Sequence, residues 1–343
     1  MALSCILTVA VPTFNMEQWL EKNLATYQDK RFQNRLEVLC LNNASEDSSK
    51  QIMERFVQND PCIFKLIDRN TRGYGSSINA AIAAARGRYF RIVDADDWVD
   101  TEELSKLLDY LETSDTDVVL TDYQIVNMQN GEKTPVRASD KGIAYFTKSL
   151  SFAGPLRTLP SIHNTTYRTE LLRKSGFYMQ DNIFFVDEEY VILPYLSAKS
   201  VIYLPFDVYR YQVANPAQST SPKNRAKYRD HREKILRRLI PAYEKAQQAD
   251  ADRNALEYCF ERIKIGAGDH FTTLYMYVTD KKEGRRSAKN WKNYLKQNAT
   301  PFWLCVRRKA FLLSVLNIFS VSLSTYEKMK RKLLSDYKKK TAR

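Results

Sequence analysis

The sequence is poor in cysteine and has no long uninterrupted apolar run. Its five cysteines are odd in number and never spaced as C-x-x-C, so neither a disulfide framework nor a zinc site is indicated. The longest apolar stretch, 301–323, is interrupted by Arg307, Arg308 and Lys309, which excludes a membrane-spanning helix of ~20 apolar residues. The first residues lack the basic start and cleavage site of a signal peptide, so we expect a cytoplasmic protein.

Acidic residues are outnumbered by basic ones. The chain of 343 residues carries a formal charge of +13, and 44% of its residues are hydrophobic. This length and composition suffice for a large domain with a second one appended. The positive charge predicts attraction to polyanions, which include nucleic acid, anionic lipid headgroups and phosphorylated substrates.

Short apolar runs alternate with helical patterns in the first third of the chain. The runs are evenly apolar, as is typical of strands buried on both faces of a parallel sheet. Between two of them, Leu104, Leu107, Leu108 and Leu111 have the spacing of a helix face. The pattern predicts an α/β fold with its functional site at the carboxyl ends of the strands. The predicted strands cover residues 5–11, 36–41, 63–67, 89–93 and 117–121.

The alternation weakens after residue 121, and the composition changes again near residue 222. Between these points we expect one helix at 169–175 and another that starts near Asp187 and is cut short by Pro194. Long helical stretches rich in lysine and arginine follow. The predicted domains are therefore 1–222 and a basic helical region, 223–343.

Three aspartates follow the predicted strand at 89–93 with no basic residue among them. Carboxylates this close repel one another, and a divalent cation is the simplest partner for them. Asp94 and Asp96 can face one ion, and oxygen ligands favour Mg²⁺ or Mn²⁺. Such a site leaves coordination positions for substrate phosphates. Asp100 is expected to cap the next helix, and Asp97 either supports the site or faces solvent.

Six stretches occur along the chain in an order that resembles one enzyme family. They are AVPTFNMEQWLEKNL (10–24), LNNASEDSS (41–49), NTRGYGSSINAAIAAARGRYF (70–90), VDADDWVD (93–100), VDEEYVILPYL (186–196) and YRYQVANPAQS (209–219). The chain over these residues resembles the inverting family 2 glycosyltransferases of GT-A fold, of the kind that builds bacterial cell-surface polysaccharides. The resemblance implies a Rossmann-like, mostly parallel sheet flanked by helices.

The resemblance also implies a site for a nucleotide-diphosphate sugar, and a UDP-sugar is the expected donor. Phe14 would stack on the base, and Asn43 stands where the family has an aspartate that hydrogen-bonds uracil. Asp94-Ala95-Asp96 matches the D-x-D motif, so Asp94 and Asp96 would hold Mg²⁺ or Mn²⁺ on the diphosphate. The implied nucleotide-binding residues are Pro12, Phe14, Asn15, Asn43, Arg72, Gly73, Asn79, Asp94, Ala95 and Asp96.

A hexosyltransferase of this kind also needs a base for the acceptor hydroxyl. Asp187 matches the aspartate that serves as base in this family, and Glu188 is the rival candidate. His163 lies where acceptor contacts are expected. Gln218 and Ser219 match a segment that reaches the donor diphosphate in relatives.

The acceptor implied by the resemblance is a cell-surface glycan, a lipid-linked intermediate or a teichoic-acid-like polymer. Such acceptors are anionic or membrane-bound, which fits the basic region 223–343. The stretch 301–323 either lies on an anionic membrane at its inner face or packs on the rest of the protein or a second copy in a homo-oligomer. Two other hypotheses are a nucleotide-sugar-binding protein without catalysis and a nucleic-acid-binding protein. Because no nucleic-acid-binding module is recognisable, we expect no nucleic acid partner.

Overall fold

The computed structural model describes residues 5–137, 160–213, 222–329 and 331–332. The contacts divide the chain into two compact units, one of residues 1–218 with 242–259 and one of residues 219–241 with 260–343. Most of the segment that contains the predicted domain boundary lies outside the described residues, and so do Gln218 and Ser219.

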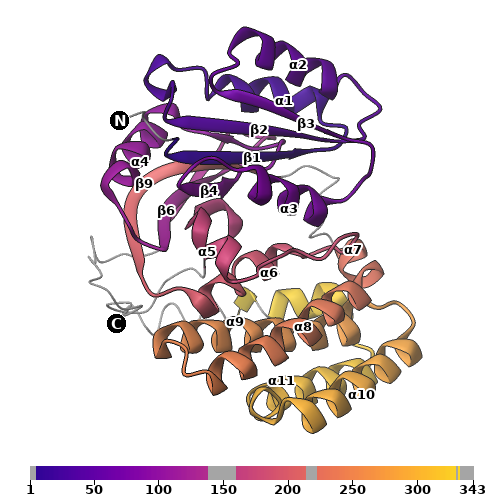
Figure 1. Cartoon of the computed structure of the whole chain (residues 1–343). Helices are drawn as coiled ribbons and strands as arrows, with labels where there is room; N and C mark the ends of the chain where they lie inside the picture. The colour runs from indigo at the N-terminus through magenta and orange to yellow at the C-terminus, as the bar shows by residue number, and fades with distance from the viewer. Residues whose placement is uncertain (1–4, 138–159, 214–221, 330, 333–343) are drawn as a thin grey trace. The chain divides into compact units, whose positions relative to one another are not determined.

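The first unit is built on one mixed sheet with the strand order β3-β2-β1-β4-β8-β6-β9-β5, and β7 pairs with β6 (Figure 1). The four strands at the β3 end run parallel, whereas β8 is antiparallel to both β4 and β6. All five predicted strands are confirmed. The bounds are β1 Leu7–Thr13, β2 Leu36–Asn43, β3 Phe64–Arg69, β4 Tyr89–Ile92, β5 Trp98–Val99, β6 Val118–Asn127, β7 Lys133–Val136, β8 Thr165–Arg168 and β9 Val201–Val213.

Helices cover both faces of the parallel part of the sheet. Figure 1 shows α1 and α2 on one side of β1 and β2 and α3 on the other. The predicted helices at 169–175 and from Asp187 are present as α5 and α6, and the second is a single turn. The bounds are α1 Glu17–Ala25, η1 Lys30–Phe32, α2 Ser49–Asn59, α3 Tyr74–Ala84, α4 Thr101–Thr113, η2 Ile162–Asn164, α5 Thr169–Lys174, α6 Asp187–Tyr190 and η3 Pro194–Ser197.

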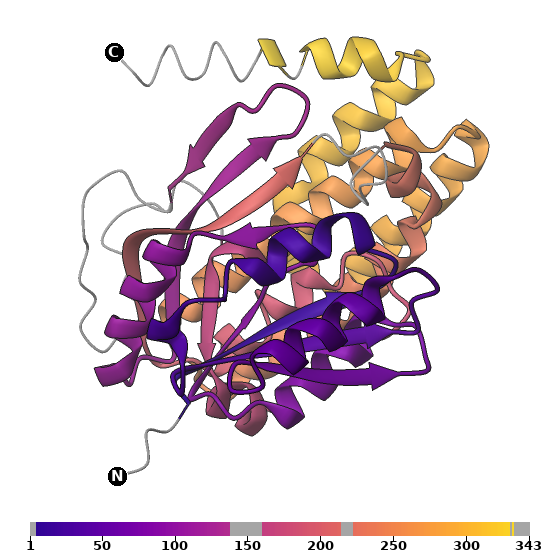
Figure 2. The ribbon, with the colours of Figure 1, turned by 90° about the horizontal axis from the view of Figure 1, so that it is seen from above.

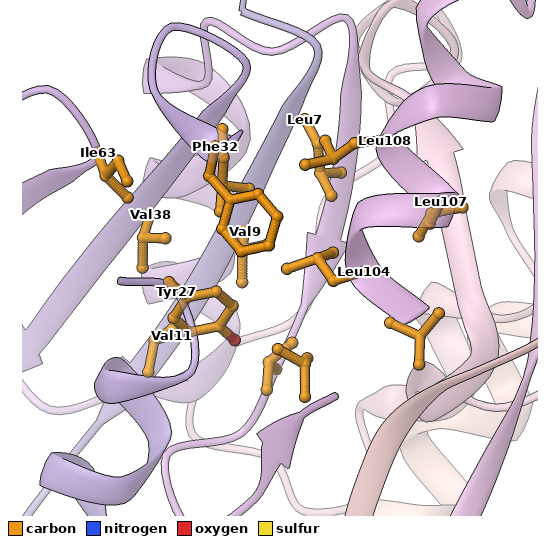
Figure 3. Packing of buried hydrophobic residues seen from close by; sticks show 14 of the residues in the cluster. Leu7, Val9, Val11, Tyr27, Phe32, Val38, Ile63, Leu104, Leu107 and Leu108 are labelled. Carbon is orange, nitrogen blue, oxygen red and sulfur yellow. The ribbon is translucent and has the colours of Figure 1, made fainter. Parts of the chain in front are cut away.

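The core beneath α1 and α4 holds β1 in place. Leu7, Val9 and Val11 alternate along the strand and are fully buried in one hydrophobic cluster. Figure 3 shows them with Val38 and Ile63 on one side and the leucines of α4 on the other. Each such side chain contributes about 1.5–3 kcal/mol through burial. The carboxyl end of β1 therefore has a fixed position.

Two long strands extend the sheet on its other side. Figure 2 shows the hairpin of β6 and β7 projecting beyond the rest of the sheet, with the end of β9 beside it. β6 and β9 run parallel, and their register shifts between Thr121 and Tyr123. The length of β9 matters for the site because its second half carries Tyr209, Tyr211 and Gln212.

The second unit is helical, as predicted for the basic region. Its core contains the fully buried Trp291, whose indole N–H donates to the Ala267 carbonyl at 3.4 Å. Over the described ranges, no helix has the length and apolarity needed to cross a membrane. The helices beyond residue 221 are α7 Pro222–Lys227, α8 Arg229–Gln248, α9 Arg253–Thr272, the π-helix η4 Thr273–Tyr277, α10 Lys281–Asn298 and α11 Thr300–Ile318, of which α8 and α9 contribute residues to both units.

Candidate functional site

One buried asparagine holds the acidic loop, residues 94–97, which follows β4. Asn23, on α1, is fully buried, and its side-chain N–H₂ donates to the carbonyls of Asp94 at 3.0 Å and Asp97 at 2.8 Å. Asp94 and Asp96 are half-buried, and Ala95 between them is buried. The backbone of the loop is therefore fixed while its two outer carboxyl groups remain partly accessible.

Asp97 supports the loop and does not face solvent. Its side chain is 2% exposed and accepts hydrogen bonds from the Tyr209 hydroxyl and, at 2.7 Å, from the Gln212 backbone N–H. Burial and the neighbouring charges of Asp96 and Asp94 raise the pKa of Asp97 well above its ordinary value. β9 thus fixes Asp97 from one side of the loop. Asp100 caps α4 as predicted, with its carboxylate accepting from the Glu103 N–H at 3.1 Å.

Asp94 lies in an environment that disfavours its charge. Burial, repulsion from Asp96 and the more distant charge of Asp187 raise its pKa to about 7, although Tyr74 donates its hydroxyl to the carboxylate at 2.9 Å. Burial also raises the pKa of Asp96. Carboxyl groups whose charge is disfavoured by burial and by neighbouring carboxylates are suited to a cation, which would supply the missing positive charge.

A cluster that fits a metal ion occurs here among the described residues. One carboxylate oxygen each of Asp94 and Asp97 and one ring nitrogen of His163 all lie within 4.8 Å of one another. This set differs from the predicted pair of Asp94 and Asp96, since Asp96 is not in it. The two hydrogen bonds accepted by Asp97 are directed at its carboxylate, so Asp97 is the member least available to an ion.

His163 lies among aromatic rings beside the acidic loop. It stacks on Tyr211 with ring centres 4.1 Å apart and also contacts Tyr209 and Tyr123. Burial and the nearby charge of Arg91 lower its pKa to about 3, so the imidazole is neutral at neutral pH. A neutral imidazole can accept a hydrogen bond or bind a metal.

Arg91, in β4, is buried next to His163. Its guanidinium donates to the Thr166 and Thr121 hydroxyls at 3.0 and 3.3 Å and to the His163 carbonyl. Burial lowers its pKa to about 10, which leaves it protonated at neutral pH. The guanidinium is therefore a fixed positive charge that positions His163 through its backbone.

Three consecutive acidic residues in α6 occupy different environments. Asp187, the first helical residue, is exposed, and its charge adds to burial in raising the pKa values of both Asp94 and Tyr74. Glu188 is half-buried. Glu189 is fully buried and accepts from the Gln180 backbone N–H at 2.8 Å and its side-chain amide at 2.6 Å. Asp187 is thus close to the acidic loop and accessible, whereas Glu189 has a structural role.

Glu189 holds the loop that contains Met179 and Gln180, and this loop packs on α3. Asn79 exchanges two hydrogen bonds with the backbone of Met179, at 2.8 and 2.9 Å. A Cβ at Gly75 would lie 2.0 Å from the Gln180 carbonyl oxygen, and Gly73 has a φ of +146°. Both glycines are therefore required by close approach or backbone conformation. Asn79 holds this loop, and its predicted contact with the nucleotide remains untested.

The loops after β1, β2 and β3 contact one another where the sequence predicts that the nucleotide base binds. Asn15, with φ of 52°, accepts from the Glu46 N–H at 2.8 Å. Helix α1 begins at Glu17, so the side chain of Asn15 does not cap it and instead joins two loops. The Arg72 guanidinium lies 4.4 Å from the centre of the Phe14 ring and pairs with Glu46.

Asn43 and Pro12 lie deeper at the same edge. Asn43 is buried and its side-chain carbonyl accepts from Arg69 at 3.0 Å. Arg69 also donates to the Gly73 carbonyl at 3.2 Å, which connects the β2 and β3 loops to the start of α3. Pro12 is buried in β1 opposite Leu41. Side chains far apart in the sequence are thus brought to one sheet edge.

Three residues of the site were not singled out from the sequence. Asn23 and Tyr209 hold the acidic loop, and Tyr74 donates to Asp94. Tyr74 and Tyr209 do fall inside quoted stretches, so their place in a motif was the available signal. Asn23 has the same signal, since it lies inside the quoted stretch 10–24.

Comparisons with known proteins agree with this geometry. Residues 8–178 match the model of the family described as glycosyl transferase family 2. EpsH of Bacillus subtilis (strain 168) is 24% identical over 213 residues, which are 60% of each chain. The poly(ribitol-phosphate) beta-N-acetylglucosaminyltransferase TarS of Staphylococcus aureus (strain Mu50 / ATCC 700699) is 22% identical over 217 residues, which are 62% of this chain and 36% of TarS. The chain thus spans less than two thirds of either relative.

A solved structure shares the fold over nearly the whole chain. The crystal structure of S. aureus TarS 1–349 in complex with UDP-GlcNAc superposes with a TM-score of 0.68 at 18% identity, covering 94% of this chain and 92% of that one. The similarity confirms the predicted GT-A fold with its helical C-terminal region. On the family match and the ordered site, the chain belongs to glycosyl transferase family 2.

Proposed function

We propose that the protein is an inverting glycosyltransferase that moves a sugar from a UDP-sugar to a hydroxyl group of an acceptor. The observation that carries this proposal is the approach of Asp187 to the acidic loop, where its charge raises the pKa of Asp94. A donor-binding carboxylate pair and an accessible base are thus near one another. The uracil assignment rests on Asn43 and on the UDP-GlcNAc bound by the related TarS structure.

Asp94 and Asp96 would hold Mg²⁺ or Mn²⁺, and His163 and Asp97 stand beside them. When bound, the metal offsets the negative charge that develops on the departing nucleoside diphosphate. Phe14, stacked against Arg72, would border the nucleotide base.

Asp187 would act as the base. It takes the proton of the acceptor hydroxyl as that oxygen bonds to the anomeric carbon. The bond from this carbon to the diphosphate breaks on the opposite face, and its electron pair leaves with UDP. Tyr74 orients Asp94 by donating its hydroxyl to the carboxylate at 2.9 Å.

The acceptor we propose is an anionic or membrane-bound cell-surface polymer, such as a glycan, a lipid-linked intermediate or a teichoic-acid-like chain. Support comes from the basic region 223–343, which we propose as a separate acceptor-contacting or membrane-contacting domain, and from the name of the related TarS. We place the reaction on the cytoplasmic side of the membrane. His163 is the proposed acceptor contact.

A thermal-shift screen of nucleotides tests the donor. UDP with Mn²⁺ should raise the melting temperature more than GDP or CDP with Mn²⁺. If no nucleoside diphosphate shifts the transition, the proposal fails. If GDP gives the largest shift, the role of Asn43 is wrong.

The choice of base is tested by two matched variants. Asp187→Asn should abolish sugar transfer while Mn²⁺-dependent UDP binding is retained, and Glu188→Gln should keep most of the activity. The reverse result would assign the base to Glu188. UDP binding by a parent protein that transfers no sugar would favour the alternative of a nucleotide-sugar-binding protein without catalysis.

A further inference from the structure

Helix α11 has two apolar faces on opposite sides. One is packed inside the second unit, and its members recur every three or four positions. They are Phe302, Val306, Ala310, Leu313 and Asn317. This face accounts for the position of the helix in the unit.

The opposite face is apolar and exposed. Its side chains are spaced by multiples of about 3.6 residues from Leu304, which puts them on one side of the helix. Within the described ranges, the four most exposed large apolar side chains all belong to this face. The outer face consists of Leu304 at 51% exposure, Phe311 at 71%, Leu312 at 57% and Ile318 at 65%, with Phe319 at 77% directly after the helix.

Positive charge accompanies the outer face. Arg307 and Arg308 are exposed and lie between Leu304 and Phe311 in the sequence, on the same side of the helix. The sequence from 300 to 326 contains no aspartate or glutamate. Residues 328–343 add eight lysines and arginines against one aspartate. A partner for this surface must therefore offer both apolar contact and negative charge.

An anionic lipid bilayer meets both requirements, whereas a second copy of this helix meets only one. Two copies paired through their outer faces would bring four arginines together without an acidic residue of either helix to oppose them. We propose that the outer face of α11 binds the surface of an anionic membrane. Phe311, Leu312 and Phe319 enter the boundary of the acyl chains, and the arginines lie at the headgroups. This binding is separate from sugar transfer and does not depend on which donor is used.

Sedimentation of the full chain with vesicles tests the surface. The protein should bind vesicles of phosphatidylcholine mixed with phosphatidylglycerol and not vesicles of phosphatidylcholine alone. Arg307→Gln with Arg308→Gln should weaken binding about thirtyfold, since each basic residue near such a surface contributes about 1 kcal/mol. Phe311→Ser with Phe319→Ser should weaken it by at least about tenfold.

Matched controls come from the first unit. Tyr178 is 55% exposed and Phe184 is 38% exposed, so Tyr178→Ser with Phe184→Ser also removes two exposed aromatic side chains. Lys65 and Lys199 are exposed, so Lys65→Gln with Lys199→Gln removes the same charge as the double arginine variant. Both controls should bind vesicles like the parent protein.

The chain also offers an internal reporter. Cys305 and Cys62 are exposed, and Cys305 adjoins Leu304 on the outer face. An environment-sensitive dye on Cys305 in a Cys62→Ser background should shift to the blue with anionic vesicles. The same dye on Cys62 in a Cys305→Ser background should not shift.

Two results would overturn the proposal. One is absence of binding to anionic vesicles, or binding that the outer-face variants leave unchanged. The other is a concentration-dependent dimer in light scattering that Phe311→Ser with Phe319→Ser dissociates, which would assign the face to a second copy. UDP binding measured on the same variants separates these results from a failure of the proposed sugar transfer.

Discussion

Asn23→Ala tests how the acidic loop is held. The substitution removes the donor of two hydrogen bonds, at 3.0 and 2.8 Å, to the carbonyls of Asp94 and Asp97. Asn23 is fully buried, so the loss leaves the Asp97 carbonyl with poor access to water, whereas the Asp94 carbonyl keeps the Asp97 N–H as a donor at 3.0 Å. A buried acceptor without its partner costs about 1–3 kcal/mol. Together with about 0.5–1.5 kcal/mol for the lost bond to Asp94, the free energy of unfolding of the first unit should fall by about 1.5–4.5 kcal/mol.

Hydrogen exchange measured by mass spectrometry reports this change locally. Amides in peptides covering 93–98 should exchange about tenfold faster or more, as a loss of at least about 1.5 kcal/mol implies. Asn298→Ala is the matched control, because its amide donates one bond at 3.1 Å to the Tyr294 carbonyl on an exposed helix end. It should leave exchange in 93–98 unchanged. Equal protection in Asn23→Ala and the parent protein would refute the reasoning.

Three further outcomes follow from the same contacts. Gly75→Ala places a Cβ 2.0 Å from a backbone oxygen of the facing loop and should lower the free energy of unfolding, measured in urea, by at least about 2 kcal/mol. The control Gly131→Ala should lower it by about 1 kcal/mol, because Gly131 has a φ of +73° but open space around it. Because the pKa of Asp94 is raised to about 7 in the folded protein, its own contribution to stability is lost as the pH rises through about 7, so in EDTA the melting temperature of the parent protein should fall relative to that of Asp94→Asn over this range. Tyr209→Phe removes the hydroxyl donor to Asp97 and should lower the free energy of unfolding by about 1.5–3 kcal/mol; an unchanged urea midpoint would contradict this.

The strands and α4 could be predicted because their signal is local. Leu104, Leu107, Leu108 and Leu111 repeat at helical spacing, and all four are buried. β3 departs from the expected burial on both faces because it is an edge strand, and only Phe64 of its residues is fully buried. The antiparallel pairing of β8 was not predicted, since it joins strands that are distant in the sequence.

The candidate site was predictable where a motif marks it. The D-x-D triplet directly follows β4 and the helix cap at Asp100 is confirmed, while the roles of Asp94, Asp96 and Asp187 stay predictions. The supports of the site were not predictable, because Asn23 and Glu189 act through backbone groups of distant segments. Such contacts depend on tertiary structure and leave no periodic pattern in the sequence.

Calorimetric titration of UDP into three proteins tests the central claim most directly. The parent protein should bind UDP in the presence of Mn²⁺ and lose at least about a hundredfold in affinity when the metal is chelated. Asp96→Ala should show the same loss with Mn²⁺ present, and Asp187→Asn should bind like the parent protein. Metal-independent UDP binding, or full affinity in Asp96→Ala, would contradict the account.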